Sequence, residues 1–143
     1  MCNYCGCREF PVIAKLTAEH LAIQEVAGSL ARSLRDGDLD AARPLLAELT
    51  DLLEPHTRYE ERSLFAGLRH EPDMAETVDE LYDEHDAIDE VLQTAGRDGI
   101  DAPILLAVVE RLYRHIDKEE HGIFPAAVVL LDMSSWDEVS AVG

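Results

Sequence analysis

Six polar side chains occupy positions where the hydrophobic pattern of the sequence predicts the buried faces of helices. Apolar residues recur there at intervals of three and four, the period of a helix with one buried face. A histidine or glutamate in such a face is costly unless it is paired or bound to a metal ion. A cation would balance two carboxylates and use four imidazole lone pairs. The six residues are His20, His56, Glu60, His85, His115 and Glu119.

The spacing of two of these pairs also suits metal binding. His56 and Glu60 are four residues apart, and so are His115 and Glu119. Side chains at this spacing lie on one helix face, one turn apart, so each pair offers a nitrogen and an oxygen to neighbouring ions. A single pair of this kind is most simply a solvated contact, whereas all six residues in register predict a metal site. Imidazole suits iron, zinc and manganese, so the residues alone do not select the metal.

The chain repeats this arrangement in its two halves. Each half reads E-H and later H-x-x-x-E-E-x-x-[IL]-F, from Glu19 to Phe65 and from Glu84 to Phe124. Two helical hairpins packed with approximate two-fold symmetry would bring the six side chains to one centre. Two copies imply two metal ions, each with two histidines, bridged by the two glutamates. Glu61 and Glu120 follow the bridging glutamates, and we expect them to be solvated or hydrogen-bonded to the ligand histidines.

Four helical segments must position these residues. Breaks at Arg35–Asp38, His70–Asp73 and Gly96–Gly99 separate them, and Thr17 and Asp101 are the predicted N-caps of the first and last. Ser135-Trp136-Asp137-Glu138 has the spacing of a capping box and predicts a short extra helix. We therefore predict an all-α fold, an up-down-up-down antiparallel four-helix bundle. The expected divisions are an N-terminal arm (1–14), the bundle (15–131) and a C-terminal tail (132–143).

Composition excludes several classes of protein. The 143 residues fit one domain, and 47% are hydrophobic, which is enough for a core. The 30 acidic and 12 basic residues give a net charge of −18, which argues against a nucleic-acid partner. No apolar run approaches the roughly 20 residues that cross a bilayer. No signal-peptide pattern opens the chain, so we expect a cytoplasmic protein without a membrane partner.

Three cysteines near the start, Cys2, Cys5 and Cys7, form a C-x-x-C-x-C pattern. No later cysteine can pair with them, so they are not a disulfide framework. Zinc or an iron–sulfur cluster needs a fourth ligand, which a histidine or a second chain would have to supply. Redox activity, an intermolecular disulfide and the absence of a specific role stay open as alternatives.

The combined pattern EH…HxxxEExxLF…EH…HxxxEExxxFP resembles the hemerythrin-like, or HHE cation-binding, family over roughly residues 15 to 131. The resemblance implies a four-helix bundle with two iron ions in a non-haem, oxo- or hydroxo-bridged centre, held by the same six residues. Members of the family carry oxygen, sense oxygen or iron, or react with peroxide or nitric oxide. These small molecules are therefore the expected partners.

The sequence departs from the oxygen-carrying hemerythrins at two places. They have a fifth histidine where this chain has Asp89, and their last carboxylate follows its histidine by five residues, where this chain has Glu120. Four histidines leave an open position on each iron, which Asp89, Tyr59 or Glu61 could fill. We expect a di-iron protein that binds oxygen or reacts with peroxide, with possible catalase-like turnover. The alternative is a non-enzymatic module for iron or oxygen binding, storage or sensing.

Overall fold

The computed structural model describes residues 10–142, and every regular element within them is helical. Cys2, Cys5 and Cys7, with the predictions made for them, lie outside the described residues. The four long helices are α1 (Pro11–Arg35), α2 (Leu39–Glu60), α4 (Ala75–Asp98) and α5 (Ala102–Lys118). The shorter elements are the π-helical turns η2 (Glu61–Phe65) and η3 (Glu119–Ile123) and the helices α3 (Ala66–Leu68), α6 (Phe124–Leu130) and α7 (Met133–Ser140).

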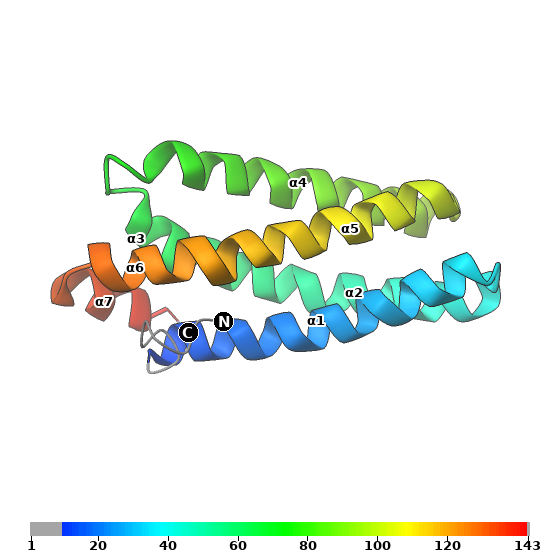
Figure 1. Cartoon of the computed structure of the whole chain (residues 1–143), viewed down its shortest axis with the longest axis horizontal. Helices are drawn as coiled ribbons and strands as arrows, with labels where there is room; N and C mark the ends of the chain where they lie inside the picture. The colour runs from blue at the N-terminus through cyan, green and yellow to red at the C-terminus, as the bar shows by residue number, and fades with distance from the viewer. Residues whose placement is uncertain (1–9, 143) are drawn as a thin grey trace.

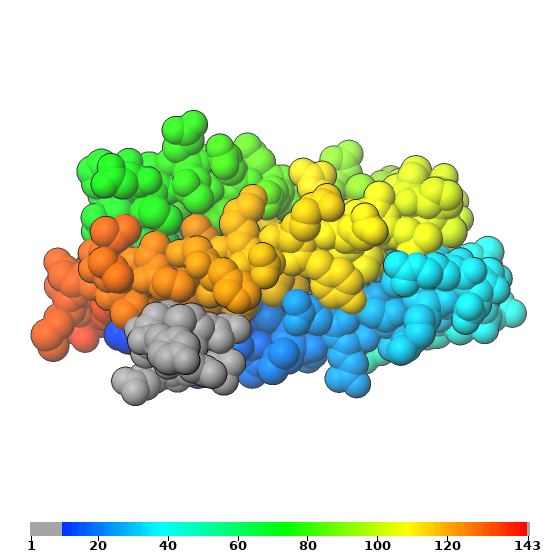
Figure 2. Space-filling view, in the orientation of Figure 1, coloured from blue at the N-terminus to red at the C-terminus, as the bar shows by residue number. Residues whose placement is uncertain are grey.

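The long helices form an up-down-up-down antiparallel bundle (Figure 1). Helix α1 packs against α2 and α5, and α4 packs against the same two helices, so each long helix has two neighbours. Figure 2 shows the elongated molecule, with α5 lying between α4 and α1 on this face. Helix α7 packs against α3 and η2 at one end of the bundle. The all-α bundle with a short C-terminal helix, predicted from the sequence, is confirmed.

Capping residues and glycines end the helices at the expected breaks. The Asp38 side chain accepts a hydrogen bond from the backbone N–H of Ala41 at the start of α2, and Asp101 accepts one from Ile104 at the start of α5. Gly37 and Gly99 follow the ends of α1 and α4 with positive φ angles of 71° and 112°, which residues with a side chain rarely adopt. The Asp101 cap is therefore confirmed.

Two predicted helix starts are wrong. Helix α1 begins at Pro11, because proline at the first helical position has its φ angle already fixed and needs no hydrogen-bond partner. The N-cap is Phe10, and Thr17 lies inside the helix. The helix therefore begins before residue 15, the expected start of the bundle. Helix α7 begins at Met133, with Asp132 rather than Ser135 as its N-cap.

The core consists of two apolar clusters with a polar layer between them. One cluster occupies the end of the bundle around Leu30, Leu49, Leu92 and Leu105. The other lies around the π-helical turns, α3 and α7, and includes Phe65 and Phe124. The buried histidines and glutamates lie between the two clusters, and each of the four long helices contributes one histidine. Both clusters border this polar layer with apolar side chains, whose low dielectric strengthens the electrostatic interactions inside it.

Candidate metal centre

The structure brings all six predicted side chains together in the middle of the bundle. They form two overlapping groups, in each of which one donor atom per residue lies within 4.8 Å of the others. Every side chain in both groups is buried. Each group has two histidines and shares both glutamates. The first group is His20, His56, Glu60 and Glu119, and the second is His85, His115, Glu60 and Glu119.

The two π-helical turns begin at the shared glutamates. Helix α2 changes to π geometry immediately after Glu60, and α5 does so at Glu119. Consecutive side chains on a regular α-helix diverge by about 100°, because a turn has 3.6 residues. Here Glu60 faces the centre, while Glu61 accepts a hydrogen bond from the buried His85. In the same way, Glu119 faces the centre, while Glu120 accepts one from His20. Turns of this kind are common at functional sites, and here they let two successive carboxylates serve one centre.

Each histidine is oriented by a carboxylate at its Nδ1 atom. The Nδ1–H of His20 donates to Glu120 at 2.9 Å, and that of His56 donates to Glu19 at 2.8 Å. An ionised carboxylate only accepts hydrogen bonds, so each Nδ1 must carry the proton. The remaining nitrogen, Nε2, is therefore the one left for a metal ion. His85 and His115 are held in the same way by Glu61 at 2.7 Å and by Glu84 at 2.9 Å.

The four histidine–carboxylate bonds connect the helices in a ring. Glu19 on α1 holds a histidine of α2, and Glu84 on α4 holds one of α5. The bond from Glu61 joins the end of α2 to α4, and the bond from Glu120 joins the end of α5 to α1. Every pair of neighbouring long helices thus contributes one such bond, which fixes the histidines relative to one another.

Sequence reasoning anticipated part of this arrangement. The bonding of Glu61 and Glu120 to the ligand histidines was one of two predicted outcomes, and the structure shows the bonded one. The roles of Glu19 and Glu84 were missed. Their signal was the repeated E-H dipeptide, in which the glutamate supports a histidine of the neighbouring helix rather than the histidine beside it.

The inner atoms of the centre fit a cation. Within residues 10–142, His20 Nε2 and all four carboxylate oxygens of Glu60 and Glu119 are buried without a hydrogen-bond partner. The Nε2 atoms of His85 and His115 lie 3.0 Å apart, and with both Nδ1 atoms protonated their lone pairs would face each other. Such a set of buried acceptors is unfavourable unless protons or metal ions lie between them.

The pKa values show how the chain without metal compensates for this cost. Burial raises the pKa of Glu60, and the neighbouring Glu119 raises it further. Burial acts to lower the pKa of His20, but the Glu119 carboxylate, 3.2 Å from its Nε2, and the hydrogen bond to Glu120 raise it to about 10. His85 behaves in the same way, with Glu60 and Glu61 raising its pKa to about 10. Protons on His20 and His85 therefore occupy positions that metal ions would take.

Phenylalanine rings cover the two outer faces of the histidine layer. The Phe124 ring stacks on His20 with 5.7 Å between centroids, and the Phe65 ring stacks on His85 at 5.3 Å. Both phenylalanines are fully buried. They occupy equivalent places in the two halves of the chain, as the repeated sequence motif predicts.

Other candidate residues lie elsewhere. Asp89 is exposed, accepts a weak hydrogen bond from Gln93 at 3.4 Å, and belongs to neither donor group found in residues 10–142. The Tyr59 ring packs below the Lys15 ammonium, with 3.5 Å between Nζ and the ring centroid. His121 is exposed and pairs with Asp117, as expected of a solvated residue.

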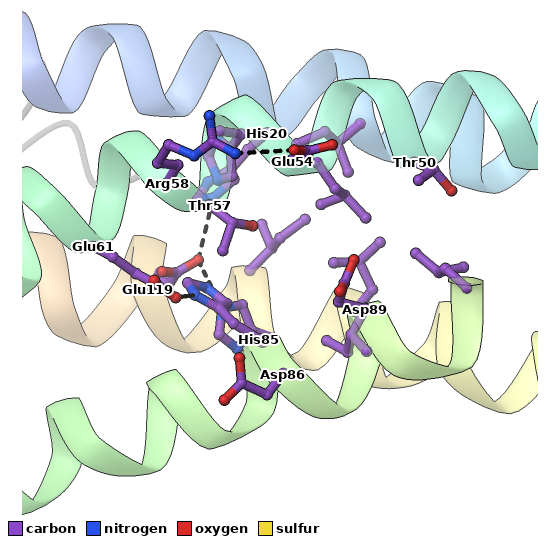
Figure 3. A pocket seen from close by; sticks show the side chains of 18 of the residues that line it. His20, Thr50, Glu54, Thr57, Arg58, Glu61, His85, Asp86, Asp89 and Glu119 are labelled. Carbon is purple, nitrogen blue, oxygen red and sulfur yellow. Dashed lines mark hydrogen bonds and ion pairs between the residues drawn. The ribbon is translucent and has the colours of Figure 1, made fainter. Parts of the chain in front are cut away.

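A pocket of about 360 Å³ connects the centre to the surface between α2 and α4. All four histidines and Glu119 line its inner part, together with apolar side chains such as Ile23, Ile88 and Leu112. Figure 3 shows the polar outer part, where Thr50, Glu54 and Arg58 on α2 lie opposite Asp86 and Asp89 on α4.

Comparison with known protein families agrees with this geometry. Residues 12–127 match the hemerythrin HHE cation-binding domain. The match covers most of the chain, so the protein belongs to this family. No curated protein and no solved structure shows significant similarity to the chain. None of the helices in residues 10–142 combines the length and apolar character needed to cross a membrane.

Proposed function

We propose that the six buried side chains hold two metal ions, iron in the cell, and that the loaded protein binds oxygen or reacts with peroxide. The observation that carries this proposal is the pair of overlapping donor groups, which share both carboxylates. A shared carboxylate has two oxygens and can reach both ions, so Glu60 and Glu119 are the proposed bridges. Iron ions bound there would supply the electron-transfer chemistry that the side chains of this chain lack.

The protein's own residues would orient and protect this chemistry. Glu19, Glu61, Glu84 and Glu120 hold the four imidazoles in the tautomer that presents Nε2 inward. Phe65 and Phe124 keep water from the faces of two of these rings. The pocket between α2 and α4 leaves one side open to a small molecule.

Two features favour reaction with peroxide over reversible oxygen carriage. Each donor group supplies two imidazoles and two carboxylates, fewer than the roughly six ligands of octahedral sites. Asp89, which replaces the fifth histidine of the oxygen carriers, lies outside both groups. Positions for an external molecule therefore remain next to the open pocket.

The test is oxygen release from hydrogen peroxide by the iron-loaded protein, after metal analysis and an absorption spectrum have established two irons per chain. Glu60→Ala and Glu119→Ala should abolish the release, because each removes a bridge and leaves a void. Substitution of Cys2, Cys5 and Cys7 together should leave it largely intact. Release no faster than from free iron, with a stable reversible oxygen adduct, would instead favour the carrier or sensor alternative.

A further inference from the structure

The mouth of the pocket between α2 and α4 has a strong excess of negative charge. Four carboxylates line its outer part, from Glu54, Glu61, Asp86 and Asp89, against one cation, Arg58. The guanidinium of Arg58 is already paired with Glu54 at 2.9 Å, and Glu61 is bonded to His85. Within residues 10–142, no ion pair neutralises Asp86 or Asp89. These two aspartates therefore dominate the local field.

The same pocket reaches the inner atoms of the metal centre. His20 and Glu119, whose buried inner atoms Nε2 and Oε1 lie 3.2 Å apart, both line it. Figure 3 shows Asp89 extending from α4 toward α2, and Asp86 next to His85 with its carboxylate turned away from α2. Asp86 and Asp89 line the same pocket as the histidines, so a charged solute inside it experiences the field of both carboxylates. Charged clefts with low-dielectric walls concentrate solutes of opposite charge and slow the entry of solutes of like charge.

A second pocket, between α1 and α5, differs from the first in its charge and in the atoms that it reaches. Its charged side chains are the basic Arg114, Lys118 and His121 and the acidic Asp117 and Glu120, so it lacks the excess of negative charge found in the first pocket. Of the four histidines it touches only His20, beside Glu120, which bonds to the Nδ1 atom of that ring. It therefore borders the outer side of the histidine layer, whereas the pocket between α2 and α4 reaches the inward-facing atoms.

We propose that the pocket between α2 and α4 is the passage from solvent to the metal centre, and that Asp86 and Asp89 make it cation-selective. Divalent metal ions enter through it readily, whereas small anions are hindered. This inference rests on the proposed function only in requiring that the centre binds metal. It adds that two residues which are not themselves metal ligands favour the entry of cations over anions.

The test compares a cation and an anion in the same variant. Asp86→Asn with Asp89→Asn removes two charges from the mouth, and Asp83→Asn with Glu90→Gln removes two from exposed positions of α4 outside the pocket. Azide association with the iron-loaded protein is followed by its absorption band. Cobalt(II) uptake by the metal-free protein is followed in the visible range. Each rate is measured at low and at high ionic strength.

Loss of the two charges should make azide association about five-fold faster and cobalt(II) uptake about five-fold slower at low salt, the size expected for two charges at the entrance. Both differences should shrink near 1 M salt, where the Debye length is about 3 Å. The control pair should change each rate less than two-fold. A structural disturbance of the pocket would move both rates in one direction, and this outcome, or unchanged azide association, would overturn the proposal. If metal analysis finds that the unaltered chain retains neither iron nor cobalt(II), the metal centre itself is refuted.

Discussion

Each buried histidine of the centre has two nitrogens with different tasks. Nδ1 binds a carboxylate of a neighbouring helix, and Nε2 faces the interior between Glu60 and Glu119. The carboxylate determines the tautomer, the ring orientation and the basicity of the inward nitrogen. A hydrogen bond to His56 is the main cause that lowers the pKa of Glu19, so this carboxylate is ionised at neutral pH. Metal affinity should therefore depend on residues that never touch the metal.

Glu19→Gln tests this dependence. The amide keeps the size of the side chain but loses the charge that polarises His56, so affinity should fall about 10- to 100-fold. Competition with a chelator measures the change, and circular dichroism verifies that the helices remain. Glu25→Gln, at an exposed position on the same helix, is the matched control. Equal affinities for the Glu19 variant and the unaltered chain would contradict the assigned role.

Metal binding should release protons. In the metal-free chain the pKa values of His20 and His85 are raised to about 10, so both rings are protonated near pH 7. A metal ion at Nε2 displaces that proton, and affinity should therefore rise as the pH increases from about 7 toward 10. The sign follows because, at pH values below the raised pKa, the bound proton stabilises the metal-free form and competes with the metal ion. Calorimetry in buffers of different ionisation enthalpy counts the released protons, and a count of zero would refute this account.

At the scale of elements, the two π-helical turns connect the centre to the apolar end of the bundle. Phe65 ends η2 and Phe124 follows η3, and each ring stacks on a histidine of another helix. The turns thus place a metal-facing glutamate, a histidine-holding glutamate and a covering ring within one short segment. The arrangement occurs once in each half of the chain.

Phe124→Ala should destabilise the fold and expose the centre. Removal of a fully buried phenylalanine costs about 3–5 kcal/mol through lost burial and the cavity that remains. Chelators should also extract the metal faster, because water gains access to His20. Val129→Ala, at a position that is 82% exposed, should change stability by less than about 0.5 kcal/mol. Urea unfolding of both variants provides the comparison, and a loss below about 1 kcal/mol at Phe124 would be inconsistent with its packing.

The predictability of these elements from sequence follows from what each depends on. The register of His56 and Glu60 is local, because spacing along one helix fixes which side chains share a face. The break at Gly37 and the cap at Asp101 are local as well. The partnership of Glu19 with His56 depends on how two helices pack, so the E-H dipeptide marks Glu19 but does not identify its partner. The π-helical turn after Glu60 likewise depends on the assembled bundle, because it lies where Glu60 and Glu61 both turn toward the centre. Sequence alone therefore did not predict it.

At the scale of the whole molecule, the charge distribution predicts that the stability of the bundle depends on metal. The chain has a formal net charge of −18, and self-repulsion of this size weakens a compact state. Two of its carboxylates, Glu60 and Glu119, lie in the centre of the bundle with no exposed surface. Two divalent ions at the centre would neutralise them and would connect all four long helices. Metal binding to the folded state adds directly to folding free energy.

Removal of metal should therefore lower the melting temperature. At a free metal concentration a hundred times the Kd, one bound ion contributes about 2.7 kcal/mol. For a domain of this size that corresponds to roughly 5–10 °C. Scanning calorimetry before and after thorough chelation measures the difference. An unchanged melting curve, in protein shown by metal analysis to have been loaded, would contradict a buried metal centre.

A paired variant separates loss of the buried site from a general effect of charge. Glu60→Gln with Glu119→Gln removes both buried charges and both proposed bridges, so its melting temperature should not respond to chelation. Asp83→Asn with Glu90→Gln removes the same number of charges from exposed positions and should keep the full response. If instead both pairs lost the response equally, the dependence on metal would come from overall charge and not from the centre.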